Sequence, residues 1–370
     1  MMKTNNTNGA VIAPLGIYVH IPFCVRKCKY CDFVSFGGKT HEEQLDYVNV
    51  LCAEITAKAK TCSNRYYVDT IFFGGGTPSI LNAEDLIKIL NTIKNNFTVQ
   101  NNAEISFEAN PGTINIEKLS KLKDAGFNRI SIGVQSFNND VLKAIGRIHN
   151  AKEAEEAATL AKSLDFNLNI DLMFGLPKQD LSIFKETFDK ALSLKPNHIS
   201  FYSLQLEEGT ELFKEYKYGD LNLPTWDENR EMYHYACDSL NNAGYEHYEI
   251  SNAAKPGYRC KHNIKYWSLD EYLGFGLSAH SFVDGKRTDD ENPDLKGDFI
   301  FTKLRLIEGF DKKEYEDRFG ISFEDEFNDS YKSLLEEGLL KEENYIISFT
   351  KKGLDYTNPV MQRLLEKLMR

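Results

Sequence analysis

The chain of 370 residues lacks the features that would direct it into a membrane or onto nucleic acid. It has no apolar run of the roughly 20 residues that a membrane-spanning helix needs. Its N-terminus is polar, and its first apolar run is short and broken by Pro14, which does not resemble a signal peptide. Lys and Arg total 44 against 55 Asp and Glu, a formal net charge of -11, and they form no basic block. We therefore expect no nucleic-acid partner and at most peripheral membrane contact.

Cysteine is scarce and unevenly placed. There are only seven cysteines, an odd number, and three of them lie together at Cys24, Cys28 and Cys31. This distribution is not a disulfide framework and is typical of metal chemistry in a reducing compartment, so we predict a cytoplasmic protein. The scattered thiols are expected to pack as small apolar residues; they are Cys52, Cys62 and Cys237.

The spacing C-x3-C-x2-C puts three thiolates on one short loop after the apolar run Ile17 to Val19. A 4Fe-4S cluster normally has four cysteine ligands, so a loop with three leaves one iron open to another molecule. A zinc site is the alternative, but zinc modules usually have a second ligand pair nearby. Three buried structural cysteines are a further alternative. We predict that Cys24, Cys28 and Cys31 hold a 4Fe-4S cluster.

A glycine cluster follows the next predicted strand. The run from Asp69 to Phe73 ends in Gly74, Gly75, Gly76, Thr77 and Pro78, which lets a ligand approach the backbone closely. Alone, such a cluster is usually a turn. After a C-x3-C-x2-C loop, it resembles the radical S-adenosylmethionine (SAM) superfamily, in which this segment receives the amino group of the methionine moiety.

Apolar, β-rich runs alternate with amphipathic stretches, which predicts a parallel α/β fold. The count of six units favours an open, TIM-like partial (β/α)6 barrel, which is also the usual radical SAM core. The predicted strands are Ile17 to Val19, Thr70 to Phe73, Glu104 to Glu108, Arg129 to Gly133, Leu168 to Met173 and Ile199 to Leu204. The predicted helices lie near 42–60, 83–96, 115–125, 151–164, 180–193 and 225–243.

Polar residues stand at the ends of successive predicted strands. Glu108 closes the third, Gln135 follows the fourth and Asp171 lies on the fifth. A lone carboxylate there usually caps a helix, but several on neighbouring strands favour a ligand site. Arg147 can place a positive charge at this site, although a surface salt bridge is nearly as plausible a role for it.

Five motifs in order make the resemblance specific: Y-V-H-I-P-F-C, G-G-G-T-P, E-A-N-P, G-V-Q-S-F and D-L-M-F-G-L-P. The chain resembles the family of oxygen-independent coproporphyrinogen III oxidase and its haem chaperone relatives, the HemW group. The resemblance implies that the three cysteines bind the cluster. It also implies SAM contacts from Tyr18, Gly75, Gly76, Thr77, Glu108, Gln135, Arg147 and Asp171.

Two departures separate the chain from the oxidase. Phe33 stands where the oxidase has a fourth cysteine, and only 23 residues precede Cys24, where the oxidase has an extended segment for its substrate. We therefore expect no coproporphyrinogen oxidase activity.

The segment from Cys260 to Trp267 contains H-N-x-x-Y-W, which resembles the HemW haem-binding motif, with His262 as the axial ligand. Histidine is a normal haem ligand, and aromatic rings offer flat surface to a porphyrin. The alternatives are a core histidine between packed aromatics, or Cys260 as a thiolate ligand. Three other histidines near motifs are expected to be structural: His20, His149 and His280.

We predict three regions along the chain: a radical SAM core over 1–245, a connecting segment with the haem motif over 246–295, and a C-terminal domain over 296–370. An aspartate-rich stretch at 285–297 is typical of a linker or exposed loop. The following helix near 325–338, strand Tyr345 to Phe349 and helix near 352–368 resemble the small, winged-helix-like α+β domain of the family.

The expected function is that of a haem chaperone, which binds one haem and transfers it to an acceptor protein such as a membrane respiratory enzyme. The cluster and SAM would gate this transfer, with a homodimer as a further expectation. The alternative is a radical SAM oxidoreductase that acts on a porphyrinogen or another substrate, so an enzymatic role stays open.

Overall fold

A run of six parallel strands forms the centre of the protein in the computed structural model, which describes residues 4–5, 11–219, 221–288 and 294–368. Each strand pairs in parallel with the next along the chain. The six are β2 (Val11–Ile21), β5 (Tyr66–Gly75), β6 (Thr98–Ala109), β7 (Arg129–Gln135), β8 (Asn167–Phe174) and β9 (His198–Ser203). The six predicted strands are confirmed.

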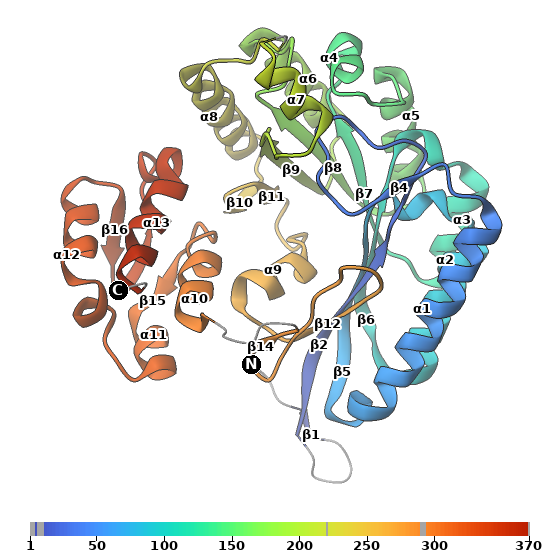
Figure 1. Cartoon of the computed structure of the whole chain (residues 1–370), viewed down its shortest axis with the longest axis horizontal. Coiled ribbons are helices and arrows are strands. Elements are labelled where there is room, and N and C mark those ends of the chain that lie inside the picture. The colour runs from blue at the N-terminus through green and yellow to red at the C-terminus, as the bar shows by residue number, and fades with distance from the viewer. Residues whose placement is uncertain (1–3, 6–10, 220, 289–293, 369–370) are drawn as a thin grey trace.

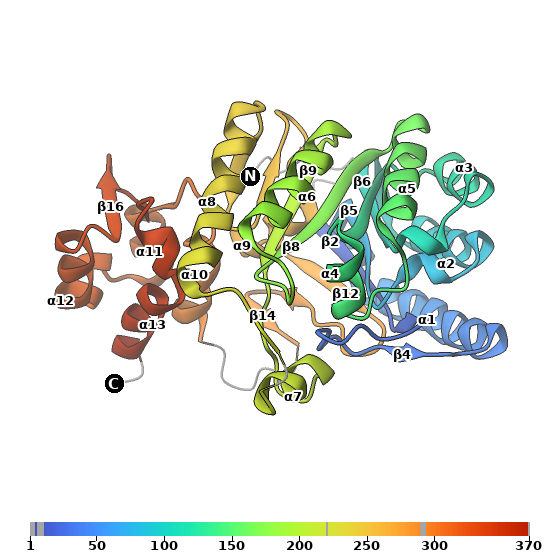
Figure 2. The ribbon, with the colours of Figure 1, turned by 90° about the horizontal axis from the view of Figure 1, so that it is seen from above.

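Amphipathic helices cover the outer side of this curved sheet (Figure 1). They are α1 (His41–Cys62), α2 (Ala83–Asn96), α3 (Ile116–Ala125), α5 (Ala151–Ser163), α6 (Leu181–Ser193) and α8 (Trp226–Asn242). Several of these helices begin at a capping box, which in α1 consists of Thr40 and Glu43. Seen from above, the helices flank the strands along one layer (Figure 2).

Short strands extend both edges of the sheet, which the sequence analysis did not predict. β10 (Glu246–Glu249) and β11 (Asn252–Ala254) continue it antiparallel beyond β9. At the other edge, β12 (Tyr272–Phe275) pairs in parallel with β2, followed by β13 (Phe282–Val283) and β14 (Lys286–Arg287). Among the described strands the sheet has two free ends, so the barrel is open, as predicted.

The region 246–295, expected to be a connecting segment, therefore supplies strands to both edges of the main sheet. It also holds α9 (Lys261–Ser268), which carries the H-N-x-x-Y-W motif on the inner side of the sheet (Figure 1). Part of the predicted linker at 285–297, residues 289–293, lies outside the described residues; α10 already begins at Leu295. The domain boundaries themselves stay predictions.

Smaller elements connect these layers. β1 (Thr4–Asn5) pairs with β2, and β3 (Phe23–Cys24) pairs with β4 (Phe36–Gly37) around the cysteine loop. Two short helices, α4 (Asn139–Ala144) and α7 (Glu211–Lys217), follow β7 and β9. Single 3-10 turns lie at Ser63–Arg65, Pro78–Ile80, Pro111–Thr113 and Gly353–Tyr356.

The C-terminal part has a hydrophobic core of its own, which includes Phe299, Tyr315, Phe323 and Leu364. Its elements are α10 (Leu295–Lys303), β15 (Phe310–Asp311), α11 (Lys312–Phe319), α12 (Phe323–Glu336), β16 (Leu340–Glu343), β17 (Ile346–Phe349) and α13 (Thr357–Leu368). The three strands form a separate sheet in the order β15-β17-β16. This arrangement confirms the predicted small α+β domain.

Candidate functional site

The cysteine loop leaves the carboxyl end of β2 and is tied to two distant segments. The backbone N–H of Lys29 donates to Ile145 O at 3.2 Å, and the N–H of Leu212 donates to Lys29 O at 2.9 Å. The Lys29 side chain also forms an ion pair with Glu211 at 3.4 Å and a closer one with Glu215. The loop is therefore held from both sides at a residue between two of the cysteines.

Each of two cysteine sulfurs contacts another predicted site residue. Arg147 Nη1 donates to Cys28 Sγ at 3.4 Å, and Cys24 Sγ lies 3.6 Å from Thr77 Oγ1. Burial raises the pKa of the Cys31 thiol to about 11. A neutral thiol must lose its proton to bind metal, so metal loading of this loop releases protons.

The residues present fit a cluster better than a single ion. Within the described ranges, no three His, Cys, Asp or Glu side chains converge closely enough to bind one metal ion, so the loop does not present a preformed zinc site. A cubane makes a different demand, because each cysteine binds a separate iron. Arg147 also keeps a buried Nε without a hydrogen-bond partner, beside Cys28, where an anionic ligand would satisfy it.

The G-G-G-T-P segment lies directly against the start of the cysteine loop. Gly76 N–H donates to Ile21 O at 2.9 Å and Thr77 N–H donates to Phe23 O at 2.7 Å. A Cβ on Gly76 would lie 2.6 Å from Phe23 O, so only glycine fits there. Because these N–H groups already donate hydrogen bonds within the protein, the segment can offer a ligand only carbonyl oxygens and the Thr77 hydroxyl. Such hydrogen-bond acceptors suit an ammonium group.

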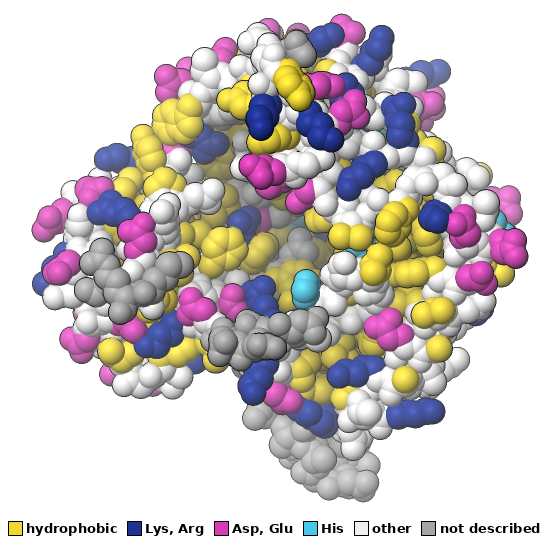
Figure 3. Space-filling model, viewed as in Figure 1, with side chains coloured by type: hydrophobic (Ala, Val, Ile, Leu, Met, Phe, Trp, Pro, Cys, Tyr) yellow, Lys and Arg dark blue, Asp and Glu magenta, His cyan; other side chains and the backbone are white. Residues whose placement is uncertain are grey.

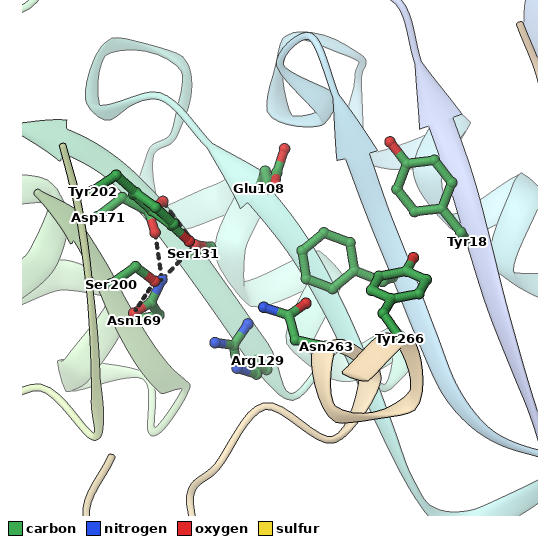
Figure 4. A pocket seen from close by; sticks show the side chains of 11 residues that line it. Tyr18, Glu108, Arg129, Ser131, Asn169, Asp171, Ser200, Tyr202, Asn263 and Tyr266 are labelled. Atoms are coloured by element: carbon green, nitrogen blue, oxygen red, sulfur yellow. Dashed lines mark hydrogen bonds between the residues drawn. The ribbon is translucent and has the colours of Figure 1, made fainter. Parts of the chain in front are cut away.

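The inner face of the sheet encloses a cavity of about 190 Å³. Three residues predicted from the sequence line it: Tyr18, Glu108 and Asp171 (Figure 4). Gln135 and Arg147 are not among its lining residues. Gln135 ends β7 with a φ of 67°, and Arg147 donates to Gly133 O and to Cys28. Of these predicted residues, three thus line the cavity and Arg147 contacts the cysteine loop.

The two carboxyl groups of the cavity are electrostatically coupled. Burial, together with the nearby Asp171, raises the pKa of Glu108 to about 8. Burial also raises the pKa of Asp171, although Ser131 Oγ and Asn169 Nδ2 donate hydrogen bonds to it at 2.8 and 2.7 Å. Glu108 accepts from Gly75 N–H at 3.2 Å, which links the cavity to the glycine segment.

Sequence reasoning missed most of the cavity wall. The remaining lining residues are Phe72, Arg129, Ser131, Asn169, Ser200, Tyr202, Asn263 and Tyr266. Those on strands β7, β8 and β9 are separated by two positions along the chain and alternate with buried apolar residues. That period-2 alternation of polar and apolar residues was the available signal.

His262 lies behind this wall and is fully buried. Its Nδ1 is 2.8 Å from Thr70 Oγ1 and its Nε2 is 2.8 Å from Tyr266 Oη, so both ring nitrogens are engaged. Phe72 stacks on the imidazole with ring centroids 5.4 Å apart. Burial lowers the pKa of His262 to about 3. The imidazole is therefore neutral, and an iron ligand at Nε2 must displace the tyrosine hydroxyl.

Cys260, the alternative ligand, is fully buried beside the Glu104 carboxylate. Its sulfur lies 3.6 Å from Glu104 Oε1, and burial raises the pKa of the thiol to about 12. Glu104 also accepts the N–H groups of Lys261 and His262, both at 3.2 Å, and so caps the start of α9. This environment opposes a thiolate at Cys260.

Two further histidines are internal, as expected. His20 connects Tyr18 Oη, 3.1 Å from its Nδ1, with Val34 O, 3.0 Å from its Nε2. His149 lies between Asn110 Oδ1 and Val134 O, both at 3.1 Å.

Comparison with known proteins identifies both parts of the chain. The radical SAM superfamily matches residues 18–191, and the HemN C-terminal domain matches residues 293–356. Heme chaperone HemW of Escherichia coli (strain K12) is 35% identical, covering 96% of this chain and 99% of that protein. Heme chaperone HemW of Bacillus subtilis (strain 168) is 36% identical, covering 95% of this chain and 99% of that protein.

The chain belongs to the HemW heme chaperone family. The family resemblance expected from the motifs is confirmed. The radical SAM domain matched over residues 18–191 implies a 4Fe-4S cluster and SAM.

A solved structure confirms the fold. Coproporphyrinogen III oxidase (HemN) of Escherichia coli, a radical SAM enzyme, superposes with a TM-score of 0.80 at 24% identity, covering 95% of this chain and 90% of that one. The match supports the predicted partial barrel and C-terminal domain. In the residues that the structure describes, no helix is both long and apolar enough to cross a membrane.

Proposed function

We propose that this protein binds one haem and transfers it to an acceptor protein, and that its cluster and SAM site controls the transfer. One observation carries the proposal: residues of the H-N-x-x-Y-W helix share a cavity with predicted SAM contacts. Asn263 and Tyr266 of α9 line the same space as Tyr18, Glu108 and Asp171. Occupancy of one site can therefore alter the other through direct contact.

Cys24, Cys28 and Cys31 would hold the cluster, which supplies an iron with an open coordination position when bound. Gly75, Gly76 and Thr77 would receive the amino group of SAM. The remaining proposed SAM contacts are Tyr18, Glu108, Gln135, Arg147 and Asp171. The Arg147 guanidinium beside Cys28 stabilises thiolate charge and still has one N–H to offer a carboxylate.

His262 is the proposed axial haem ligand. Its neutral imidazole has the protonation state that iron binding needs, and release of Tyr266 would expose Nε2. We further propose that the protein works in the reducing cytoplasm, in keeping with its seven free thiols. A membrane respiratory enzyme as acceptor, peripheral membrane contact and a homodimer belong to the same hypothesis.

The test is anaerobic reconstitution with iron and sulfide, followed by haem titration and by transfer to an apo-acceptor. We expect one haem per chain, with binding lost in His262→Ala and transfer altered by SAM. A porphyrinogen oxidase is the competing function. Conversion of coproporphyrinogen to protoporphyrinogen by the reconstituted protein would overturn the chaperone proposal.

A further inference from the structure

Arg129, the first residue of β7, is a buried cation on the wall of the cavity, and among the described residues its side chain has no hydrogen-bond acceptor. Its exposed fraction is 2%, yet it lines the cavity. Nε is enclosed without a partner, and in the described part of the chain none of its N–H groups donates a hydrogen bond. Buried charged groups are normally paired and hydrogen-bonded. An unsatisfied guanidinium facing a cavity therefore indicates a ligand that supplies the acceptor.

The acidic neighbours of Arg129 do not fill this role. Glu104 and Asp171 both interact with it electrostatically. However, Glu104 accepts the N–H groups at the start of α9, and Asp171 accepts from Ser131 and Asn169. The two acidic side chains lie near the guanidinium but leave its donors free.

Figure 4 shows the Arg129 guanidinium between Asn169 and Asn263, facing the open space of the cavity. The Asn263 amide, from the H-N-x-x-Y-W motif, lies beside it and adds a neutral donor to the charged one. A guanidinium presents parallel N–H groups that match the two oxygens of a carboxylate. The chemistry of this corner therefore selects a carboxylate.

The size of the cavity limits the ligand. At about 190 Å³ it is smaller than the roughly 300–1,000 Å³ of a pocket for a whole drug-sized ligand. It can therefore enclose only part of a ligand such as haem or SAM. The concave region between the sheet and the C-terminal domain is open on the face in Figure 3, so a larger body can lie outside.

We propose that Arg129, with Asn263, binds a propionate carboxylate of the haem. This proposal rests on the proposed haem function. It gives the asparagine of the motif a role in orienting the porphyrin, separate from the iron ligand.

The test compares haemin with haemin dimethyl ester, whose carboxylates are esterified, in absorption titrations of the reconstituted full-length protein. Because a hydrogen bond to a charged group is stronger than one to a neutral group, we expect the wild type to bind the ester at least about tenfold more weakly. Arg129→Gln should bind both compounds equally. Arg230→Gln, in a separate cavity between α8 and the C-terminal domain, should keep the preference.

Each result is decisive. If the wild type binds both compounds equally, the carboxylate proposal is wrong and haem binding stands. If it binds neither, the proposed function itself fails. If Arg230→Gln removes the preference and Arg129→Gln does not, the carboxylate binds in the other cavity.

Should Arg129→Gln fail to fold, Asn263→Asp provides the second variant. It keeps the side-chain volume and places a carboxylate next to Arg129, so the preference for haemin should disappear while the circular dichroism spectrum is unchanged. Retention of the full preference in folded Asn263→Asp would overturn the proposal.

Discussion

The hydroxyl of Tyr266 lies 2.8 Å from Nε2 of His262, one helical turn away on α9. The same imidazole contacts Thr70 through Nδ1, 192 residues earlier in the chain. The motif therefore contains both a potential iron ligand and the group that blocks it. Iron coordination by His262 requires a change in Tyr266.

Tyr266→Phe should strengthen haem binding. The substitution removes a competing hydrogen bond worth about 1 kcal/mol, which corresponds to roughly fivefold in affinity. Absorption titration with haemin measures the change. Tyr272→Phe is the matched control, because its ring packs 4.7 Å from Tyr266 without contacting His262. Unchanged or weaker binding by Tyr266→Phe would indicate that His262 serves only in packing.

Glu108 should make stability depend on pH. Its pKa in the folded protein, about 8, lies above the ordinary value of 4.5. A raised carboxyl pKa means that stability is lost as the pH rises through this interval. Glu108→Gln stays neutral, so its stability advantage over the wild type should grow by more than about 1.4 kcal/mol, the equivalent of one pKa unit, between pH 5.5 and 9.

Urea unfolding at both pH values measures this difference. The control is Glu156→Gln, which replaces an exposed carboxylate on α5 and should show little pH-dependent change. An advantage for Glu108→Gln that is equal at both pH values would contradict the raised pKa.

Replacement of Cys28 by alanine should abolish cluster loading. The wild type, reconstituted anaerobically, should contain about four irons per chain, and Cys28→Ala should contain almost none. Iron and sulfide analysis together with the absorption spectrum measure this. Cys52→Ala and Cys237→Ala, which change half-buried thiols packed against the core, should load normally. Uptake of a single zinc instead of four irons would contradict the cluster assignment.

Gly76→Ala should destabilise the junction between the glycine segment and the cysteine loop. The new Cβ would lie 2.6 Å from Phe23 O and 3.0 Å from Ile21 O, both backbone atoms. Overpacking of this kind costs about 1–3 kcal/mol. Gly112→Ala is the control, because no atom lies within 4 Å of its added Cβ. Equal unfolding free energies for the two variants would show that the junction accommodates the added Cβ without loss of stability.

The central fold was predictable because its strands are long apolar runs and its helices are amphipathic. The edge strands were not. β12 has only four residues, Tyr272–Phe275, and becomes a strand because its backbone pairs with β2. β10 and β11 have four and three residues; they pair with each other, and β11 joins the sheet only by pairing with β9, which is distant in the sequence.

The candidate site was only partly predictable for the same reason. Motifs identified Glu108, near the end of β6, and Asp171, within β8, because the order of the motifs along the chain is distinctive. Arg129 begins its strand and belongs to no motif, so only the packing of neighbouring strands places it in the cavity. The burial of His262 depends on Thr70 and Phe72, which no local pattern around the histidine reveals.

Lys29 joins three pieces of chain at one backbone position, between Cys28 and Cys31. A metal centre that stiffens those cysteines therefore also stiffens α7, through Leu212 and the ion pair with Glu215. Iron loading of the cysteine loop would thus be felt at a helix that contains none of the cluster ligands.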